Sequence, residues 1–230
     1  MINTYNENLI HKELKSQYAA KYNGKIEEKI DTYICDVYSK EAGIFEIQTS
    51  NLFKLKNKIF SLAKNFKITL VYPIILEKTI IKINSQGMII SERKSPKHKK
   101  FIQIFEEIAG SYSLFFEENF SFHVVPITIT ETRMITDAPV QNFSKSRKKL
   151  QNWILLEKRI TKQFNTIYVH KREDLLQFIP KNLPKIFTAK DIKETEKIKN
   201  PYKILWTLEH LQFVQVKEIK GRIKYFTFLS

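Results

Sequence analysis

The spacing of apolar residues changes several times along the first third of the chain. Ile10, Leu14 and Tyr18 recur at the helical period, which predicts a helix over residues 6–22. Runs of β-branched and aromatic residues then predict strands at 29–38, 44–48 and 67–76. Apolar residues at helical spacing predict a helix at 52–63, between the last two of these strands. The last strand is almost continuously apolar, as expected for a strand buried on both faces of a sheet. Candidate N-caps for the helix at 52–63 are Thr49, Ser50 and Asn51.

Strands and helices continue to alternate as far as about residue 170. A hairpin is predicted over 78–91, because two runs of β-formers flank the turn residues 84–87. A helix is predicted over 101–110, and strands over 120–136. This order predicts an α/β domain over residues 1–170, in which helices flank a mixed sheet.

A second and smaller unit is predicted over residues 171–230. Its expected elements are three helices at 172–179, 189–194 and 201–211, followed by two strands at 213–218 and 222–228. Thr188 is expected to cap the second helix. Three helices followed by a β-hairpin form the order of a winged helix-turn-helix domain.

The charge of the chain narrows the choice of partners. The formal net charge is +15 and the isoelectric point is about 9.6. Lysine and arginine release counterions when they contact phosphates, so such an excess favours a polyanion as the partner. The segments 91–100 and 143–153 are basic and are interpreted as loops, in which residues 93–100 and 145–149 are candidate phosphate contacts. The alternative is a lysine-rich chain whose solvated surface is simply basic.

The cysteine count and the hydropathy pattern exclude several classes of protein. With Cys35 as the single cysteine, the chain has no intramolecular disulfide and no zinc site built from several cysteines. No apolar run is long enough to span a membrane, and the polar N-terminus does not resemble a signal peptide. We therefore expect a cytoplasmic protein without a membrane partner.

The most informative chemistry lies at Asp36, Glu46 and Gln48. Asp36 is near the end of one predicted strand, and Glu46 and Gln48 are two residues apart on the next. The period of two places the side chains of Glu46 and Gln48 on one face, and a hairpin brings Asp36 close to them. Two carboxylates and an amide offer oxygen ligands to a divalent cation, which can activate water for phosphodiester hydrolysis. An edge strand whose outward face carries Glu and Gln would give the same pattern without chemistry.

The order helix, Asp-bearing strand, Glu-x-Gln strand, helix and buried strand resembles the PD-(D/E)XK nuclease superfamily over residues 6–76. The resemblance implies a restriction-endonuclease-like fold in which Asp36 and Glu46 bind Mg²⁺ or Mn²⁺. The family's usual lysine, which positions or activates the water, is replaced here by Gln48, as in a few restriction endonucleases. The longer string FEIQT…LK.K…LVYPI also resembles a group of uncharacterised bacterial proteins with a winged-helix-like C-terminal segment.

Because Gln48 replaces the family's usual lysine, the site needs another source of positive charge. Glutamine carries no charge and cannot act as a base, although it can ligate a cation or orient a water. Lys56 and Lys58 lie on the following predicted helix and are candidates to supply the missing charge and contact DNA. Alternatively, the domain has lost cleavage and only binds DNA.

The first helix is expected to add an auxiliary acid, as it does in many members of the superfamily. Glu7 aligns with the apolar face of that helix, whereas Glu13 points away from it. His11 shares the face of Glu7 and is a candidate for phosphate contact or for a hydrogen bond to the carboxylate. Its alternative is a partly buried helix histidine. Glu28, at the start of the first strand, is a weaker carboxylate candidate.

The C-terminal unit supplies further candidate DNA contacts. Lys203 lies on the third helix, and Lys220 and Arg222 decorate the turn of the hairpin. The alternative is a protein–protein module, which is also a common use of winged helices. Trp153 and Trp206 are interpreted as core residues rather than base-stacking platforms.

The sequence therefore predicts a Mg²⁺-dependent DNA endonuclease that serves restriction, defence or repair. Glu7, Asp36, Glu46 and Gln48 are its expected catalytic residues, and the resemblance allows a homodimer. The competing hypothesis is a non-catalytic DNA-binding regulator built on a degenerate nuclease fold. A protein–protein adaptor with a basic surface is a third.

Overall fold

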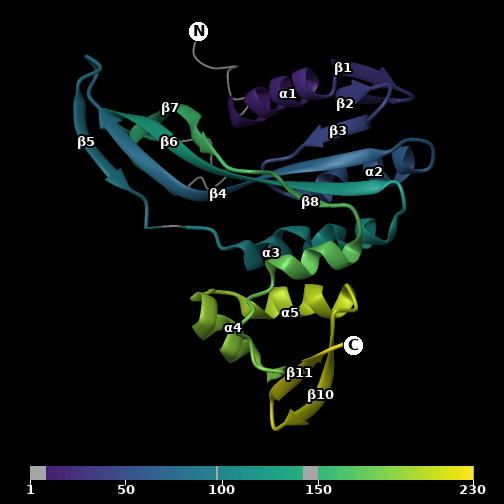
Figure 1. Cartoon of the computed structure of the whole chain (residues 1–230). Coiled ribbons are helices and arrows are strands. Elements are labelled where there is room, and N and C mark those ends of the chain that lie inside the picture. Colours follow the sequence, from purple (N-terminus) through teal and green to yellow (C-terminus); the bar gives the residue numbers. More distant parts are fainter. Residues whose placement is uncertain (1–8, 97, 142–149, 230) are drawn as a thin grey trace.

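The computed structural model describes residues 9–96, 98–141 and 150–229 (Figure 1). Its first elements are α1 (Leu9–Lys21), β1 (Lys25–Ile30), β2 (Tyr33–Ser39), β3 (Gly43–Ile47), the 3-10 segment η1 (Leu52–Leu55), α2 (Lys56–Ala63), β4 (Ile68–Ile83) and β5 (Ile89–Lys94). They are followed by η2 (Phe101–Gln103), α3 (Ile104–Ile108), η3 (Ala109–Phe116), β6 (Phe120–Gln141), β7 (Leu150–Gln163) and β8 (Ile167–Val169). The C-terminal elements are η4 (Arg172–Phe178), β9 (Ile186–Phe187), α4 (Ala189–Glu196), α5 (Pro201–His210), β10 (Val214–Lys220) and β11 (Ile223–Phe228).

Eight strands form one mixed sheet, in the order β1-β2-β3-β4-β6-β7, with β5 added to β4 and β8 added to β6. The central strands β3, β4 and β6 run parallel, and the remaining pairs are antiparallel. α1 covers one face of this sheet, and α2 and α3 cover the other (Figure 1). The predicted class is thus confirmed: helices flank a large mixed sheet.

The two faces of the sheet have separate hydrophobic cores. Leu14 and Tyr18 of α1 pack with Phe45, Val71 and Val125 on the first face. The second core contains residues of α2 and α3 and continues without interruption into α5 and β11. The C-terminal elements are therefore attached to the sheet through an apolar core rather than through a polar surface.

The segment 29–38, predicted as one strand, is two strands, so that prediction is wrong. β1 ends at Ile30, and Asp31 adopts a left-handed conformation with φ of 52° before β2 begins. Aspartate tolerates this conformation, so a tight turn fits inside an otherwise continuous run of β-formers. Residues 91–94 were likewise expected in a loop but belong to β5, whose two faces are both largely exposed. A strand without a buried face shows no apolar alternation.

The C-terminal part combines helices with a small sheet in the order β10-β11-β9. Thr188 caps α4 as predicted, because its hydroxyl accepts hydrogen bonds from the N–H groups of Lys190 and Asp191. β9 was not predicted, since its two residues are too few to give a pattern. Over the described ranges, no helix is both long and apolar enough to cross a membrane.

Candidate active site

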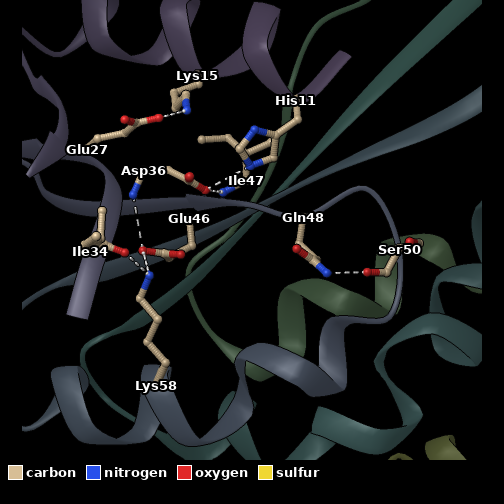
Figure 2. A network of polar contacts seen from close by, with 10 residues as sticks. All are labelled: His11, Lys15, Glu27, Ile34, Asp36, Glu46, Ile47, Gln48, Ser50 and Lys58. Carbon is tan, nitrogen blue, oxygen red and sulfur yellow. Dashed lines mark hydrogen bonds and ion pairs between the residues drawn. The ribbon is translucent and has the colours of Figure 1, made fainter. Parts of the chain in front are cut away.

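Asp36 and Glu46 meet where β2 and β3 diverge. The antiparallel pairing of these strands runs from Ser39 to Val37, opposite Phe45, and then stops. Beyond that point, carboxylate oxygens accept the hydrogen bonds of backbone N–H groups that would otherwise pair between the two strands. The N–H of Ile47 donates to Oδ2 of Asp36 at 2.8 Å, and the N–H of Asp36 donates to Oε1 of Glu46 at 3.4 Å. From this fork between the strands, the side chain of Asp36 points toward His11 of α1, and that of Glu46 points toward Lys58 of α2 (Figure 2).

Glu46 is buried and paired with a lysine from α2. Only 2% of Glu46 is exposed, and Nζ of Lys58 lies 2.6 Å from its Oε1. Lys58 also donates to the carbonyl of Ile34 at 2.6 Å, which fixes the ammonium at the fork (Figure 2). Burial raises the pKa of Glu46, and the charge of Lys58 offsets only part of this increase. Burial and the neighbouring Glu46 raise the pKa of the Cys35 thiol to about 12, so Cys35 stays protonated.

Asp36 has the opposite electrostatic character. Its Oδ2 lies 3.1 Å from Nε2 of His11 on α1, and one fifth of each side chain is exposed. Burial alone would raise the pKa of Asp36, but the hydrogen bonds from His11 and from the N–H of Ile47 lower it below its usual value. Two adjacent carboxylates therefore have their pKa values pushed in opposite directions. This separation is a common property of catalytic carboxylate pairs.

Gln48 points away from the carboxylates toward the loop before η1. Its amide donates to the carbonyl of Ser50 at 2.5 Å and approaches that of Asn51 at 3.5 Å (Figure 2). Asn51, one of the three candidate N-caps, occupies the N-cap position of η1, but its side chain makes no capping hydrogen bond. The amide of Gln48 therefore holds the loop that leads into α2.

The remaining candidates of the first domain separate into two groups. α2 directs Lys58 at Glu46, whereas Nζ of Lys56 lies 5.8 Å from the centre of the Phe60 ring. Glu28 lies on β1 and pairs with Lys25 at 3.9 Å. Glu7 lies outside the described residues. The hydrogen bond between His11 and Asp36 joins α1 to the fork.

The C-terminal candidates lie on a different part of the molecule. Burial raises the pKa of Glu106 on α3, and the positive charge of Lys203 on α5 offsets part of this increase. Lys220 pairs with Glu218 at 3.1 Å, and Arg222 is exposed in the turn before β11. Trp206 was expected in the core but is 43% exposed, so that interpretation is wrong.

The donor set at the fork suits a hard divalent cation. In the described part of the chain, no three His, Cys, Asp or Glu side chains form a metal-binding group. Mg²⁺, however, commonly uses only one or two carboxylates and keeps several of its waters. Asp36 and Glu46 supply two such carboxylates, and the partial exposure of Asp36 leaves the site open on one side.

Comparisons with known proteins connect the chain to relatives but not to an activity. An uncharacterized protein of Treponema pallidum (strain Nichols) is 28% identical to it over 194 residues, which cover 84% of this chain and 74% of the relative. No solved structure matches the chain. The model of one family, described as domain of unknown function (DUF8091), matches residues 8–170, and the chain therefore belongs to that family.

Proposed function

We propose that this protein hydrolyses DNA phosphodiester bonds with Mg²⁺ or Mn²⁺ held by Asp36 and Glu46. The observation that carries the proposal is the fork between β2 and β3, where the buried Glu46 carboxylate contacts the ammonium of Lys58 and the backbone N–H of Asp36, while the Asp36 carboxylate accepts from the N–H of Ile47. A buried charged cluster of this kind is costly to fold, which favours a role in chemistry over one in stability.

The residues at the fork have distinct roles in this proposal. Asp36 and Glu46 bind the cation, which supplies Lewis-acid polarisation of the phosphodiester when present. Lys58 then exchanges part of its contact with Glu46 for the phosphate and stabilises the negative charge that develops there. His11 holds the Asp36 carboxylate in place through its hydrogen bond.

Lys58 also accounts for the absence of a lysine in the Glu-x-Gln motif. In the resemblance to the PD-(D/E)XK superfamily, the motif lysine carries a positive charge that Gln48 lacks. Lys58 brings an ammonium from α2 to the carboxylate of Glu46, at 2.6 Å. Gln48 orients the loop through the carbonyl of Ser50 rather than substituting for that charge.

The fold interpretation is part of the proposal. The order α1-β1-β2-β3-α2-β4 supports a restriction-endonuclease-like core. The C-terminal helices and the pairing of β9 with β11 support a winged helix over residues 171–230. The family match over residues 8–170 is consistent with a domain boundary near 170.

DNA is the proposed partner because of charge. The net charge of +15 favours a polyanion, and Lys56, Lys203, Lys220 and Arg222 offer phosphate contacts outside the fork. Salt-dependent DNA binding is therefore expected even without a divalent cation.

Nicking of supercoiled plasmid tests the proposal. We expect nicking with Mg²⁺ or Mn²⁺, none with EDTA, and none by the Asp36→Ala and Glu46→Gln variants. Lys58→Met should lose at least about 100-fold in rate, as removal of a preorganised electrostatic contact does, while the matched control Lys64→Met, at the exposed C-cap lysine of α2, stays within about threefold. Equal losses in the two lysine variants would contradict the role of Lys58. Tight, salt-sensitive binding without any cleavage would instead favour the degenerate-nuclease regulator.

A further inference from the structure

A groove lies between α5 and β11, far along the chain from the carboxylate fork. Its volume is about 660 Å³, and its lining includes Tyr202, Leu205 and Trp206 of α5 and Ile223 and Tyr225 of β11. This volume lies within the range of about 300–1,000 Å³ that is usual for small-molecule sites. The groove is therefore large enough for a planar heterocycle together with its neighbours.

The helix that forms one wall is not free to enter the major groove of a duplex. α5 packs against α3 and η3 on one side and against α4 and β10 on the other (Figure 1). Five of its ten residues are buried. The stripe left exposed carries Tyr202 and Trp206, which are 73% and 43% exposed. Reading of base edges uses Arg, Lys, Asn or Gln, whereas aromatic side chains stack on bases.

Trp206 is held so that one ring face is covered. The ring of His210 stacks on it with 3.7 Å between centroids, and Nδ1 of His210 lies 2.8 Å from the carbonyl of Trp206. The edge of Tyr112 also packs against Trp206, with 5.5 Å between ring centroids. The indole is therefore ordered before any ligand arrives, and it forms part of the groove wall. A preorganised aromatic ring loses little conformational entropy when a base stacks on it.

The charges around the groove match a nucleotide chain. Lys190, Arg222 and Lys224 line the groove and are exposed, and Glu209 is the one acidic residue that lines it within the described chain. The three cations suit phosphates on either side of a bound base. Glu209 can accept a hydrogen bond from a ring N–H or an exocyclic amino group of that base.

We propose that the α5–β11 groove binds an unpaired nucleobase, stacked on Trp206 and Tyr202, with flanking phosphates on the cations at its rim. This inference rests on the proposal that DNA is the partner, but it does not depend on cleavage. It assigns to the C-terminal part a preference for single-stranded or locally opened DNA over an intact duplex.

Tryptophan fluorescence gives a local test, because Trp153 and Trp206 are the two tryptophans of the chain. The full-length protein is prepared with Trp153→Phe and Asp36→Ala, so that Trp206 reports alone and no cleavage occurs. Titration in EDTA compares a dT₁₂ oligonucleotide, a duplex of the same length and a twelve-unit abasic strand with the same number of phosphates. We expect dT₁₂ to quench Trp206 and the abasic strand to leave it unchanged. Equal quenching by the abasic strand, or none by any of the three, would overturn the proposal.

Affinity variants provide a second readout. Tyr202→Ala should weaken binding of labelled dT₁₂ by about tenfold, which corresponds to the loss of one base–aromatic stacking contact. Phe164→Ala is the matched control, since Phe164 is an aromatic residue that is 38% exposed and does not line the groove. It should change the affinity less than twofold. Equal affinities of the Tyr202 variant and wild type would contradict base stacking, whether or not the wild-type protein nicks plasmid.

Discussion

Replacement of Lys58 by methionine isolates the charge at the fork while keeping most of the side-chain volume. The side chain of Glu46 is 3% exposed and that of Lys58 is 15% exposed, so the variant leaves a carboxylate buried without its partner. Removing one partner of a buried ion pair costs about 3–5 kcal/mol. Because Lys58 retains some exposure, the lower end is expected, about 3 kcal/mol at pH 7.5.

The loss should depend on pH in a direction that follows from Glu46. Burial already raises the pKa of Glu46, and removal of Lys58 takes away the cation that opposes this increase. The folded variant then binds a proton that the unfolded chain, with an ordinary glutamate pKa, releases more readily. Its stability rises as the pH falls through the folded pKa, so the deficit relative to wild type shrinks between pH 7.5 and pH 5.5.

Urea unfolding followed by circular dichroism measures these differences. With a slope of about 3 kcal/mol per molar urea, the midpoint of Lys58→Met should fall by about 1 M at pH 7.5. Adding Glu46→Gln removes the stranded charge and should recover about 1–2 kcal/mol, since a buried amide costs less than a buried charge. A loss below about 0.5 kcal/mol for Lys58→Met, or strictly additive effects in the double variant, would refute the reasoning.

Three further predictions concern the fold. Burial lowers the pKa of His123 to about 4, so as the pH falls the unfolded chain takes up a proton at this histidine before the folded protein does. The free energy of unfolding should therefore fall by about 3 kcal/mol between pH 6.5 and pH 4. Urea titrations of His123→Gln should show a weaker dependence on pH. Gly43→Ala should lower the melting temperature much more than Gly87→Ala, although both glycines have positive φ. A Cβ at residue 43 would lie 2.2 Å from the carbonyl oxygen of Lys67, whereas nothing lies within 4 Å of a Cβ at residue 87. Equal losses in melting temperature would contradict this steric difference. Thr188→Ala should cost about 1 kcal/mol in chemical denaturation through loss of the α4 cap, and an unchanged midpoint would contradict it.

Local patterns were sufficient for elements with a regular apolar pattern and for a helix cap. The helix containing Leu14 and Tyr18, the buried strand β4 and the cap at Thr188 follow from periodicity and from side-chain hydrogen bonding over a few residues. The proximity of Asp36 and Glu46 also follows, because adjacent strands joined by a short turn pair with each other. These features depend on interactions that are close in sequence.

Features decided by tertiary packing were not predictable in the same way. Lys56 and Lys58 are two residues apart on α2, and the rotation of that helix on the sheet determines that Lys58 reaches Glu46. Trp206 is a large aromatic residue of the kind expected in a core, yet the packing of α5 between α3 and α4 leaves it partly exposed. The hydrogen bond between His11 and Asp36 joins residues 25 positions apart, a separation that no local pattern covers.

Asp36 and Glu46 are proposed to hold a divalent cation for phosphodiester hydrolysis. The most direct measurement is the initial rate of supercoiled-plasmid nicking in Mg²⁺ by wild type and by the isosteric Asp36→Asn variant, purified side by side and matched for melting temperature. Since metal-assisted stabilisation contributes several kcal/mol, we expect the rate of the variant to be at least about 100-fold lower than that of wild type. Equal rates for the two proteins would contradict it.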